Sequence, residues 1–197
     1  MRRFAALSIA VLLGLAPVGA EDMRAPQAAP ATAGDETASG VVDNLYARLA
    51  RTQFPEEAEG ILAEIEHLRM QSGSDAADLL LGRAMKARES ERLDVALPLF
   101  DAVVELYPDW SEAWSERATA RFQNGDVKGA MGDLAQTLKR DPRDVGALAG
   151  VGSILTDAGE PEGALRALDR ALALAPAYER LKEARARAQT LLWSSSP

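Results

Sequence analysis

The side chains that could perform chemistry are few and scattered in this chain of 197 residues. The sequence contains no cysteine and a single histidine, His67. Thiolate ligands, cysteine nucleophiles and disulfides are therefore excluded, and a histidine-based metal site or proton relay would lack partners. The carboxylates of Glu56, Glu57, Glu64 and Glu66 lie close together along the sequence. On a helix, such a group is typical of a solvated face and not of a catalytic pair.

Glycine and charge patterns exclude two further classes of function. No glycine-rich segment has the spacing of a P-loop or of a dinucleotide-binding motif, and Gly146, Gly150 and Gly152 fall within a predicted helix as packing positions. The formal net charge is −8, whereas nucleic-acid binding requires clustered positive charge. We therefore expect a protein that is not an enzyme, that binds no cofactor or metal ion, and that has no nucleic-acid partner.

Regular spacing, in contrast, organises most of the chain. Identical or similar residues recur at intervals of 34 in three series: the prolines Pro108, Pro142 and Pro176; the alanines Ala96, Ala130 and Ala164; and the large apolar residues Phe100, Leu134 and Leu168. A fixed period of this length is the signature of a repeat array. Aromatic residues make up only 5% of the chain, and alanine and leucine are abundant, so the repeats are predicted to be almost entirely helical.

The repeated units resemble the tetratricopeptide repeat (TPR) family. The middle unit has the family's bulky residue, small residue, Gly-Asp turn, alanine, large apolar residue and closing proline at Trp114, Ala118, Gly125, Asp126, Ala130, Leu134 and Pro142. The third unit matches through Leu148, Gly152, Gly159, Ala164, Leu168, Ala171 and Pro176. The first matches through Leu80, Ala84, Ala96, Phe100 and Pro108, but Glu91-Arg92 replaces Gly-Asp at its turn. The resemblance implies an all-α, right-handed α-solenoid of antiparallel helix hairpins.

Physical chemistry supports the match. Small residues at Ala84, Ala118 and Gly152 would let the two helices of each unit approach closely, and Gly125 and Gly159 would supply the left-handed conformation that ends each first helix.

Five residues suit the starts of helices. Ser74 and Asp126 are suited to cap a helix N-terminus, and Pro161 suits a first helical position. Asp109 and Glu112 have the spacing of a capping box.

The first 20 residues have the pattern of a secretory signal peptide. Arg2 and Arg3 precede an apolar run over residues 4–15, and Val18-Gly19-Ala20 offers the small residues of a cleavage site. The alternative is a membrane anchor, but the apolar run is shorter than the roughly 20 residues that span a bilayer. We expect export, cleavage after Ala20 and a location in the bacterial periplasm.

The remaining chain divides by composition and periodicity. Residues 21–40 are predicted to be a disordered linker, residues 41–76 a degenerate helical hairpin that looks like a degraded repeat, and residues 77–176 the three TPR units. A polar capping helix is expected over residues 177–193, because a solenoid must cover its last exposed core. Residues 194–197 are expected to be a frayed tail.

The resemblance also places a binding groove on the concave surface, formed by the first helix of each unit. Similarity to the family and the position of the cap helix predict that these side chains line it: Asp78, Leu81, Met85, Arg88, Glu112, Ser115, Thr119, Phe122, Ser153, Thr156, Arg180 and Arg187. For Met85 and Phe122, the alternative is that they only pack between units. The Lys/Asn/Arg clamp through which TPR co-chaperones hold carboxylates is missing here.

Two functions remain open at this point. The first is a periplasmic adaptor that binds a peptide or protein segment in the groove. The second is a structural subunit of an envelope or secretion complex that uses its convex or end surfaces, or that self-associates. Either protein would have a protein or peptide partner and, after signal cleavage, no membrane partner.

Overall fold

The computed structural model describes residues 33–195, and within this range the chain forms nine α-helices and no strand. The helices are α1 (Ala33–Leu49), α2 (Pro55–Arg69), α3 (Asp75–Glu89), α4 (Leu93–Leu106), α5 (Ser111–Gln123), α6 (Val127–Arg140), α7 (Val145–Asp157), α8 (Pro161–Leu174) and α9 (Glu179–Ser195). The predicted signal peptide, residues 1–20, lies outside the described residues. No helix within residues 33–195 combines the length and apolar character needed to cross a membrane.

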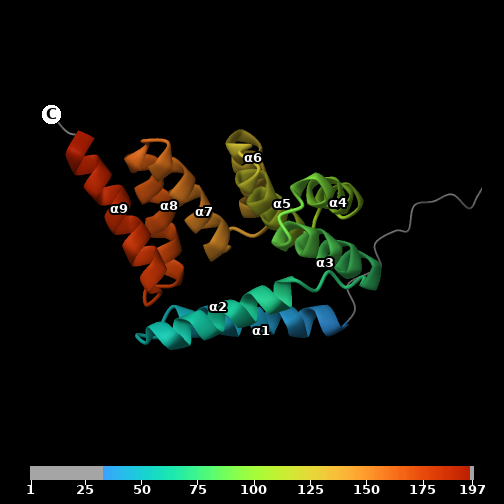
Figure 1. Ribbon diagram of the computed structural model, residues 1–197. Coiled ribbons are helices and arrows are strands. Elements are labelled where there is room, and N and C mark those ends of the chain that lie inside the picture. Colours follow the sequence, from blue (N-terminus) through green and yellow to red (C-terminus); the bar gives the residue numbers. More distant parts are fainter. Residues whose placement is uncertain (1–32, 196–197) are drawn as a thin grey trace, which may run out of the picture.

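Seven of these helices form a stack. Helices α3 and α4, α5 and α6, and α7 and α8 pack as hairpins, and the second helix of one hairpin packs on the first helix of the next. Helix α9 lies against α8 and α7 at the end of the stack (Figure 1), in the position predicted for a capping helix. The prediction of an all-α solenoid of helix hairpins is confirmed.

The turns inside the hairpins follow the expected chemistry. Gly125 and Gly159 adopt φ angles of 80° and 76°, in the left-handed region that ends a helix without steric cost. In the first unit, where glutamate replaces glycine, Glu91 adopts the same region with φ 58°. The small residue at Gly152 is also required by packing, because a Cβ atom there would lie 2.5 Å from Leu168 Cγ.

Two of the predicted helix caps are present in the structure, and a third prediction, the capping box, is wrong. The Asp126 side chain accepts a hydrogen bond from the Gly129 backbone N–H at 2.8 Å, and the Ser74 hydroxyl accepts one from Ala77 at 3.4 Å. The predicted capping box of Asp109 and Glu112 does not form. Helix α5 begins after Trp110, which makes no side-chain cap, and Glu112 is buried against an arginine of α2 instead.

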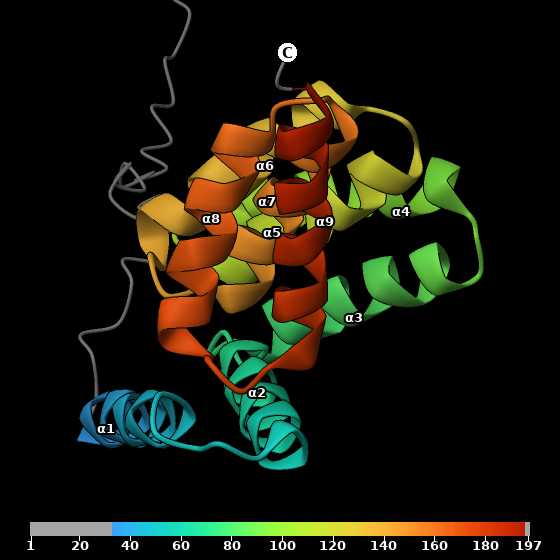
Figure 2. The same cartoon turned by 90° about the vertical axis from the view of Figure 1, so that its left-hand side faces the viewer.

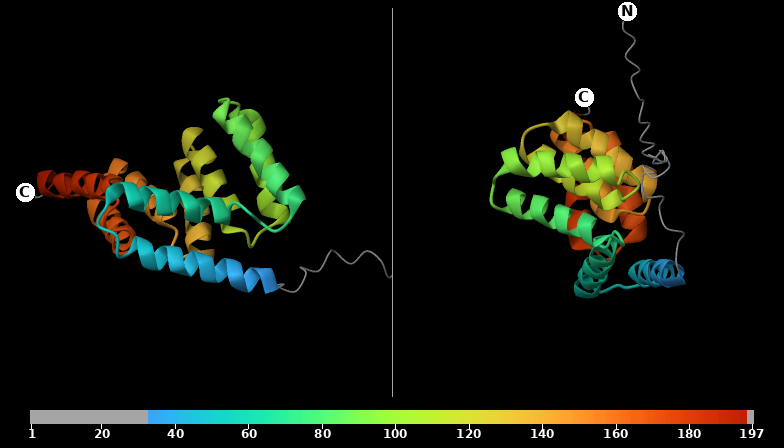
Figure 3. Two further views of the ribbon diagram at one scale, coloured as in Figure 1. Left: turned by 90° about the horizontal axis from the view of Figure 1, so that it is seen from below. Right: turned by 90° about the vertical axis from the view of Figure 1, so that its right-hand side faces the viewer.

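The N-terminal hairpin departs from the stack. Helix α1 begins at Ala33, so the helix includes part of the segment 21–40 that was predicted to be a linker. The hairpin does not continue the array beyond α3. Helix α2 instead runs across one side of the stack, below the hairpins in Figure 1 and in front of them when the molecule is seen from below (Figure 3).

Buried apolar residues show where this hairpin packs. One core cluster joins residues of α1 and α2 to residues of α7, α8 and α9, among them Leu49, Ile65, Leu148, Leu168 and Leu181. A separate cluster lies in α3, α4 and α5 around Phe100. The hairpin therefore shares its core with the last unit and the cap, and not with α3, its neighbour in sequence. Figure 2, which faces the α9 end of the stack, shows α1 and α2 below α8 and α9.

Polar contacts hold the hairpin in this position. The Tyr46 hydroxyl donates a hydrogen bond to the Arg143 carbonyl at 2.9 Å, and the Arg143 guanidinium lies over the Tyr46 ring and 2.7 Å from Asp43. At the other end of the hairpin, the Trp110 indole N–H donates to the Arg69 carbonyl at 2.9 Å. Burial raises the pKa of Tyr46 to about 12, so this hydroxyl remains a donor over the whole physiological range.

Candidate functional site

A pocket of about 500 Å³ lies between α2 and the side of the stack formed by α5, α7 and α9. We call it the central pocket. Its apolar walls come from both sides: Leu62 and Ile65 of α2, and Ala118, Phe122, Val145, Ala149, Ile154, Leu181 and Ala184 of the stack. Hydroxyl groups of Ser115, Thr119 and Ser153 add hydrogen-bonding capacity. The pocket combines apolar area with a few polar groups, which is the usual composition of a ligand site.

Charge is distributed unequally around the central pocket. Arg180 and Arg187 of α9 line it on one side and are exposed. Four carboxylates line it elsewhere: Glu66, Glu112, Glu116 and Asp144.

Arg69 is the centre of a buried ion-pair network that closes one side of the pocket. Its Nη2 atom lies 3.2 Å from Glu112 Oε2 and also pairs with Asp144, and its Nε atom lies 3.5 Å from Asp141 Oδ2. Burial disfavours the charged guanidinium, but the carboxylates of Asp144, Glu112 and Asp141 outweigh it and raise the pKa of Arg69. One arginine of α2 therefore forms ion pairs with three carboxylates of the stack.

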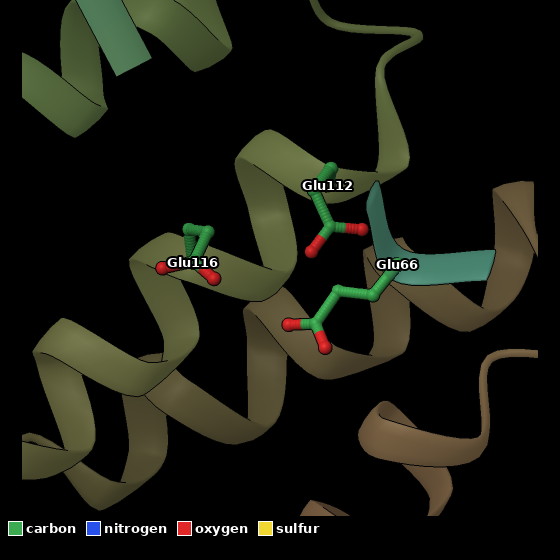
Figure 4. Close-up of side chains that lie close together, drawn as sticks. All are labelled: Glu66, Glu112 and Glu116. Carbon is green, nitrogen blue, oxygen red and sulfur yellow. The ribbon is translucent and has the colours of Figure 1, made fainter. Parts of the chain in front are cut away.

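Three carboxylates converge between α2 and α5. Oxygen atoms of Glu66, Glu112 and Glu116 lie within 4.8 Å of one another, and Figure 4 shows the side chains approaching from the two helices. Burial raises the pKa of Glu112 to about 8, partly offset by Arg69. It also raises the pKa of Glu116, partly offset by Arg88, whose Nη2 atom lies 2.7 Å from Glu116 Oε2.

This cluster has a restricted chemistry. Three carboxylates could supply oxygen ligands to a divalent cation, but Arg69 and Arg88 already pair with two of them. Burial raises the pKa of Glu112 and so also disfavours the ionised form that would bind a metal ion. The arrangement is better suited to holding a guanidinium or ammonium group than a metal ion.

The structure brings together seven of the twelve side chains predicted to line a groove. Those that line the central pocket are Glu112, Ser115, Thr119, Phe122, Ser153, Arg180 and Arg187. Phe122 is 44% exposed there. The other five lie elsewhere.

The remaining predicted groove residues have structural contacts of their own. Leu81 is buried in the core cluster around Phe100, and Met85 packs against that cluster, as its alternative interpretation proposed. Asp78 accepts hydrogen bonds from Ser72 in the loop before α3. Arg88 pairs with Glu116, and the Thr156 hydroxyl donates to the Gly152 carbonyl.

Sequence reasoning missed the contribution of α2. Leu62, Ile65, Glu66 and Arg69 all line the central pocket. Glu66 is exposed, as its interpretation on a solvated face requires, but its place at the pocket was not predicted. The available signal was the spacing of these four residues: positions i, i+3, i+4 and i+7 share one helix face. The spacing indicates a buried face but not the surface that it covers.

Comparison with known proteins agrees with this architecture. The family model described as Tetratricopeptide repeat matches residues 81–144 and 116–179. A TPR repeat-containing protein of Rhizobium etli is 36% identical over 142 residues, which cover 72% of this chain and 70% of that protein.

Two solved structures have a similar fold at low sequence identity. The first TPR domain of Spaghetti (RPAP3), bound to an HSP90 peptide, has a TM-score of 0.54 at 21% identity and covers 59% of this chain and 95% of that one. The Yersinia enterocolitica type III secretion chaperone SycD, in complex with a peptide of the translocator YopD, has a TM-score of 0.53 at 21% identity and covers 61% and 92%. With the 34-residue period, the glycine turns and the stacked hairpins, these matches establish that the chain belongs to the tetratricopeptide repeat family.

Proposed function

We propose that this protein is an interaction module that binds a protein or peptide segment in the central pocket. The observation that carries the proposal is the pocket itself, which is lined by apolar side chains such as Phe122 and Ile154, by hydroxyl groups and by charged groups of both signs. A segment of a partner could bury apolar side chains there and satisfy its polar groups at the same time.

Relatives support this proposal by analogy. The Spaghetti domain was solved with an HSP90 peptide and SycD with a peptide of YopD. The peptide of the present protein need not resemble either of them, because the carboxylate clamp of the co-chaperones is missing from the matching positions.

Binding, and not catalysis, is the function that we propose. The two carboxylates with raised pKa values in the pocket, Glu112 and Glu116, are each paired with an arginine. His67 is exposed on α2 and does not line the pocket. The perturbed pKa values are explained by burial within ion pairs, which does not require a catalytic role.

A second candidate function is that of a structural subunit. It is favoured by large apolar side chains that are exposed away from the pocket: Leu79, Leu106 and Trp193 are 58%, 65% and 71% exposed. Such residues could form a contact within a larger assembly.

Site-specific photo-crosslinking distinguishes the two candidates. A benzophenone amino acid would replace Phe122 in the pocket, Leu106 outside it, or the exposed Lys139 of α6 as a control. Binding in the pocket predicts adducts from position 122 alone. Adducts from position 106 alone would favour the structural subunit, and equal adducts from all three positions would contradict both.

We also propose that the protein acts in the bacterial periplasm. The support is the sequence pattern of residues 1–20, with two arginines, an apolar run and small residues before Glu21. Mass analysis of the protein from a periplasmic fraction should give a chain that starts at Glu21. An intact Met1, or recovery from the cytoplasmic fraction alone, would contradict this location.

A further inference from the structure

We propose that α2 is an intramolecular ligand of the central pocket, and that the partner is an amphipathic helix with a basic residue that displaces it. This inference rests on the proposed function, because it assumes that the partner binds in the same pocket. It adds the class of the partner segment and the step that opens the site.

The first argument is the way in which α2 occupies the pocket. Its lining residues Leu62, Ile65, Glu66 and Arg69 follow the spacing i, i+3, i+4 and i+7. This is the pattern by which an amphipathic helix binds in a groove. The opposite side of α2, including Gly60, Glu64 and His67, is exposed. Helix α2 is therefore seated on the stack as a separate helical partner would be.

The second argument is charge. The side chains of Glu112, Asp144 and Asp141 are only 5%, 4% and 20% exposed, and among the ion pairs of residues 33–195 Arg69 is the only base that pairs with them. If α2 left, these carboxyl groups would lose Arg69 and face the opened pocket. A helix that covered them again without a base would bury carboxylates without a countercharge, which is strongly unfavourable. A replacing helix must therefore bring a guanidinium or ammonium group to the same place.

The third argument is that α2 fills its site incompletely. A volume of about 500 Å³ remains between α2 and the helices of the stack. Close packing is the rule in protein interiors, so a helix with larger side chains could bury more apolar surface than α2 does. Helix α2 is thus a ligand that a better-fitting helix can replace.

The fourth argument is that the hairpins of the stack contact one another without α1 and α2. The N-terminal hairpin is linked to the stack by the ion pairs of Arg69, by the pair of Arg143 with Asp43 and by two hydrogen bonds. The hydrogen bonds from Tyr46 to the Arg143 carbonyl and from Trp110 to the Arg69 carbonyl hold the two ends of the hairpin. The hairpins of the stack, in contrast, pack directly on one another along their length. Displacement of α1 and α2 therefore leaves the helix contacts from α3 to α9 in place, and it uncovers the apolar residues of α7, α8 and α9 that share a core with the hairpin, which the partner would have to cover.

The test uses α2 itself as the probe. A fluorescent synthetic peptide of residues 55–71, PEEAEGILAEIEHLRMQ, is titrated against the full chain and against the full-chain double variant Tyr46→Ala/Arg69→Ala. We expect the peptide to bind the double variant about tenfold or more tightly than wild type, because in wild type the tethered α2 competes at high effective concentration.

Three variants of the peptide test what the pocket recognises. Arg69→Ala in the peptide should weaken binding to the double variant by about tenfold or more, whereas Arg69→Lys should retain most of it. Ala63→Pro interrupts the helix at a position that faces solvent in α2. It should abolish binding because the peptide can no longer form the helix, although no contact with the pocket is removed. If the Arg69→Ala peptide binds as tightly as the unchanged peptide, the partner does not need a basic residue and the proposal is wrong on that point. If the Ala63→Pro peptide binds as tightly, the partner does not need to be helical.

Hydrogen exchange of the α2 amides shows whether the double variant has released its hairpin. If the α2 amides stay protected in the double variant, the full-chain variant Leu62→Glu/Ile65→Glu provides a second way to detach the hairpin from the stack. Protection in both variants would overturn the proposal, since a hairpin that cannot leave blocks the site. Free α2 without peptide binding would overturn it as well.

The proposed function can fail independently of the inference that α2 is displaced by a helical partner. Photo-crosslinking from position 122 reports whether a native partner reaches the pocket at all. Crosslinks without peptide binding would reject only the helical, basic partner. Peptide binding without crosslinks would reject only the native use of the pocket.

Discussion

The guanidinium of Arg117 donates two hydrogen bonds to the carboxylate of Asp133, from Nε to Oδ2 at 2.9 Å and from Nη2 to Oδ1 at 2.7 Å. This bidentate pair joins α5 to α6 in the middle of the stack, and Arg121 approaches the same carboxylate at 3.0 Å. The Trp114 ring packs against Arg117 on the other side, with its centroid 4.9 Å from Cζ. The central unit is thus held by a charged contact in addition to its small-residue packing.

Replacement of Asp133 by alanine should lower the free energy of unfolding by about 3–5 kcal/mol, because it leaves a buried arginine without its main partner. The side chain of Asp133 is only 3% exposed, whereas that of Asp101, which also pairs with Arg117, is 56% exposed. Asp101→Ala is therefore the matched control and should cost at most about 1 kcal/mol. Urea unfolding measures both, and equal losses would contradict a dominant role for the buried pair.

Gly152→Ala should destabilise the third unit. The added Cβ atom would meet Leu168 Cγ at 2.5 Å, and such overpacking costs about 1–3 kcal/mol. Gly132→Ala in α6 is the control, since its Cβ atom would meet nothing within 4 Å. That substitution should stabilise by about 0.5–1 kcal/mol, because alanine is the better helix former. The two variants should shift the melting temperature in opposite directions, and a shift of the same sign would contradict the packing argument.

Glu91→Gly should stabilise the first unit. Glu91 has φ 58° at the turn where the other two units have glycine, and a residue with a side chain is strained in this conformation. Removing the strain should add about 0.5–1 kcal/mol after the greater flexibility of glycine in the unfolded chain is included. The reverse change, Gly125→Glu, should destabilise. Thermal unfolding of both variants tests the prediction, and no gain for Glu91→Gly would contradict it.

Sequence predicted the parts of the fold that depend on local chemistry. The left-handed turns at Gly125 and Gly159 and the cap at Asp126 follow from conformational preference and side-chain hydrogen bonding within a few residues. The close approach at Gly152 follows from the repeat register, because the same position is Ala84 and Ala118 in the other units. These features need no knowledge of distant contacts.

The position of the N-terminal hairpin could not be predicted in this way. The hydrogen bond from Tyr46 to Arg143 joins residues 97 apart in the sequence, and the pair of Arg69 with Asp144 joins residues 75 apart. An amphipathic stripe shows that a face must be buried, but not which surface buries it. The register of the repeats favoured a stacked position, and the long-range polar and apolar contacts place the hairpin across the stack instead.

The last prediction concerns pH and Glu112. Burial raises the pKa of this carboxyl from its ordinary value of 4.5 to about 8 in the folded protein. Between these two values the folded state holds a proton that the unfolded state has lost. Unfolding therefore releases a proton, and the free energy of unfolding should fall as pH rises from about 5 to 8, by at most about 1.4 kcal/mol per pH unit from this group.

Glu112→Gln isolates this contribution, because the amide has a similar shape and does not titrate. Urea unfolding of both proteins at several pH values should give curves that diverge, with wild type losing stability relative to the variant as pH rises from about 5 to about 8 and no further divergence above that range. The stability present at low pH belongs to the neutral carboxyl, so the sign of the divergence is fixed by the upward pKa shift. A wild type that instead gains on the variant as pH rises would show that Glu112 is ionised in the folded state and that its pair with Arg69 outweighs burial.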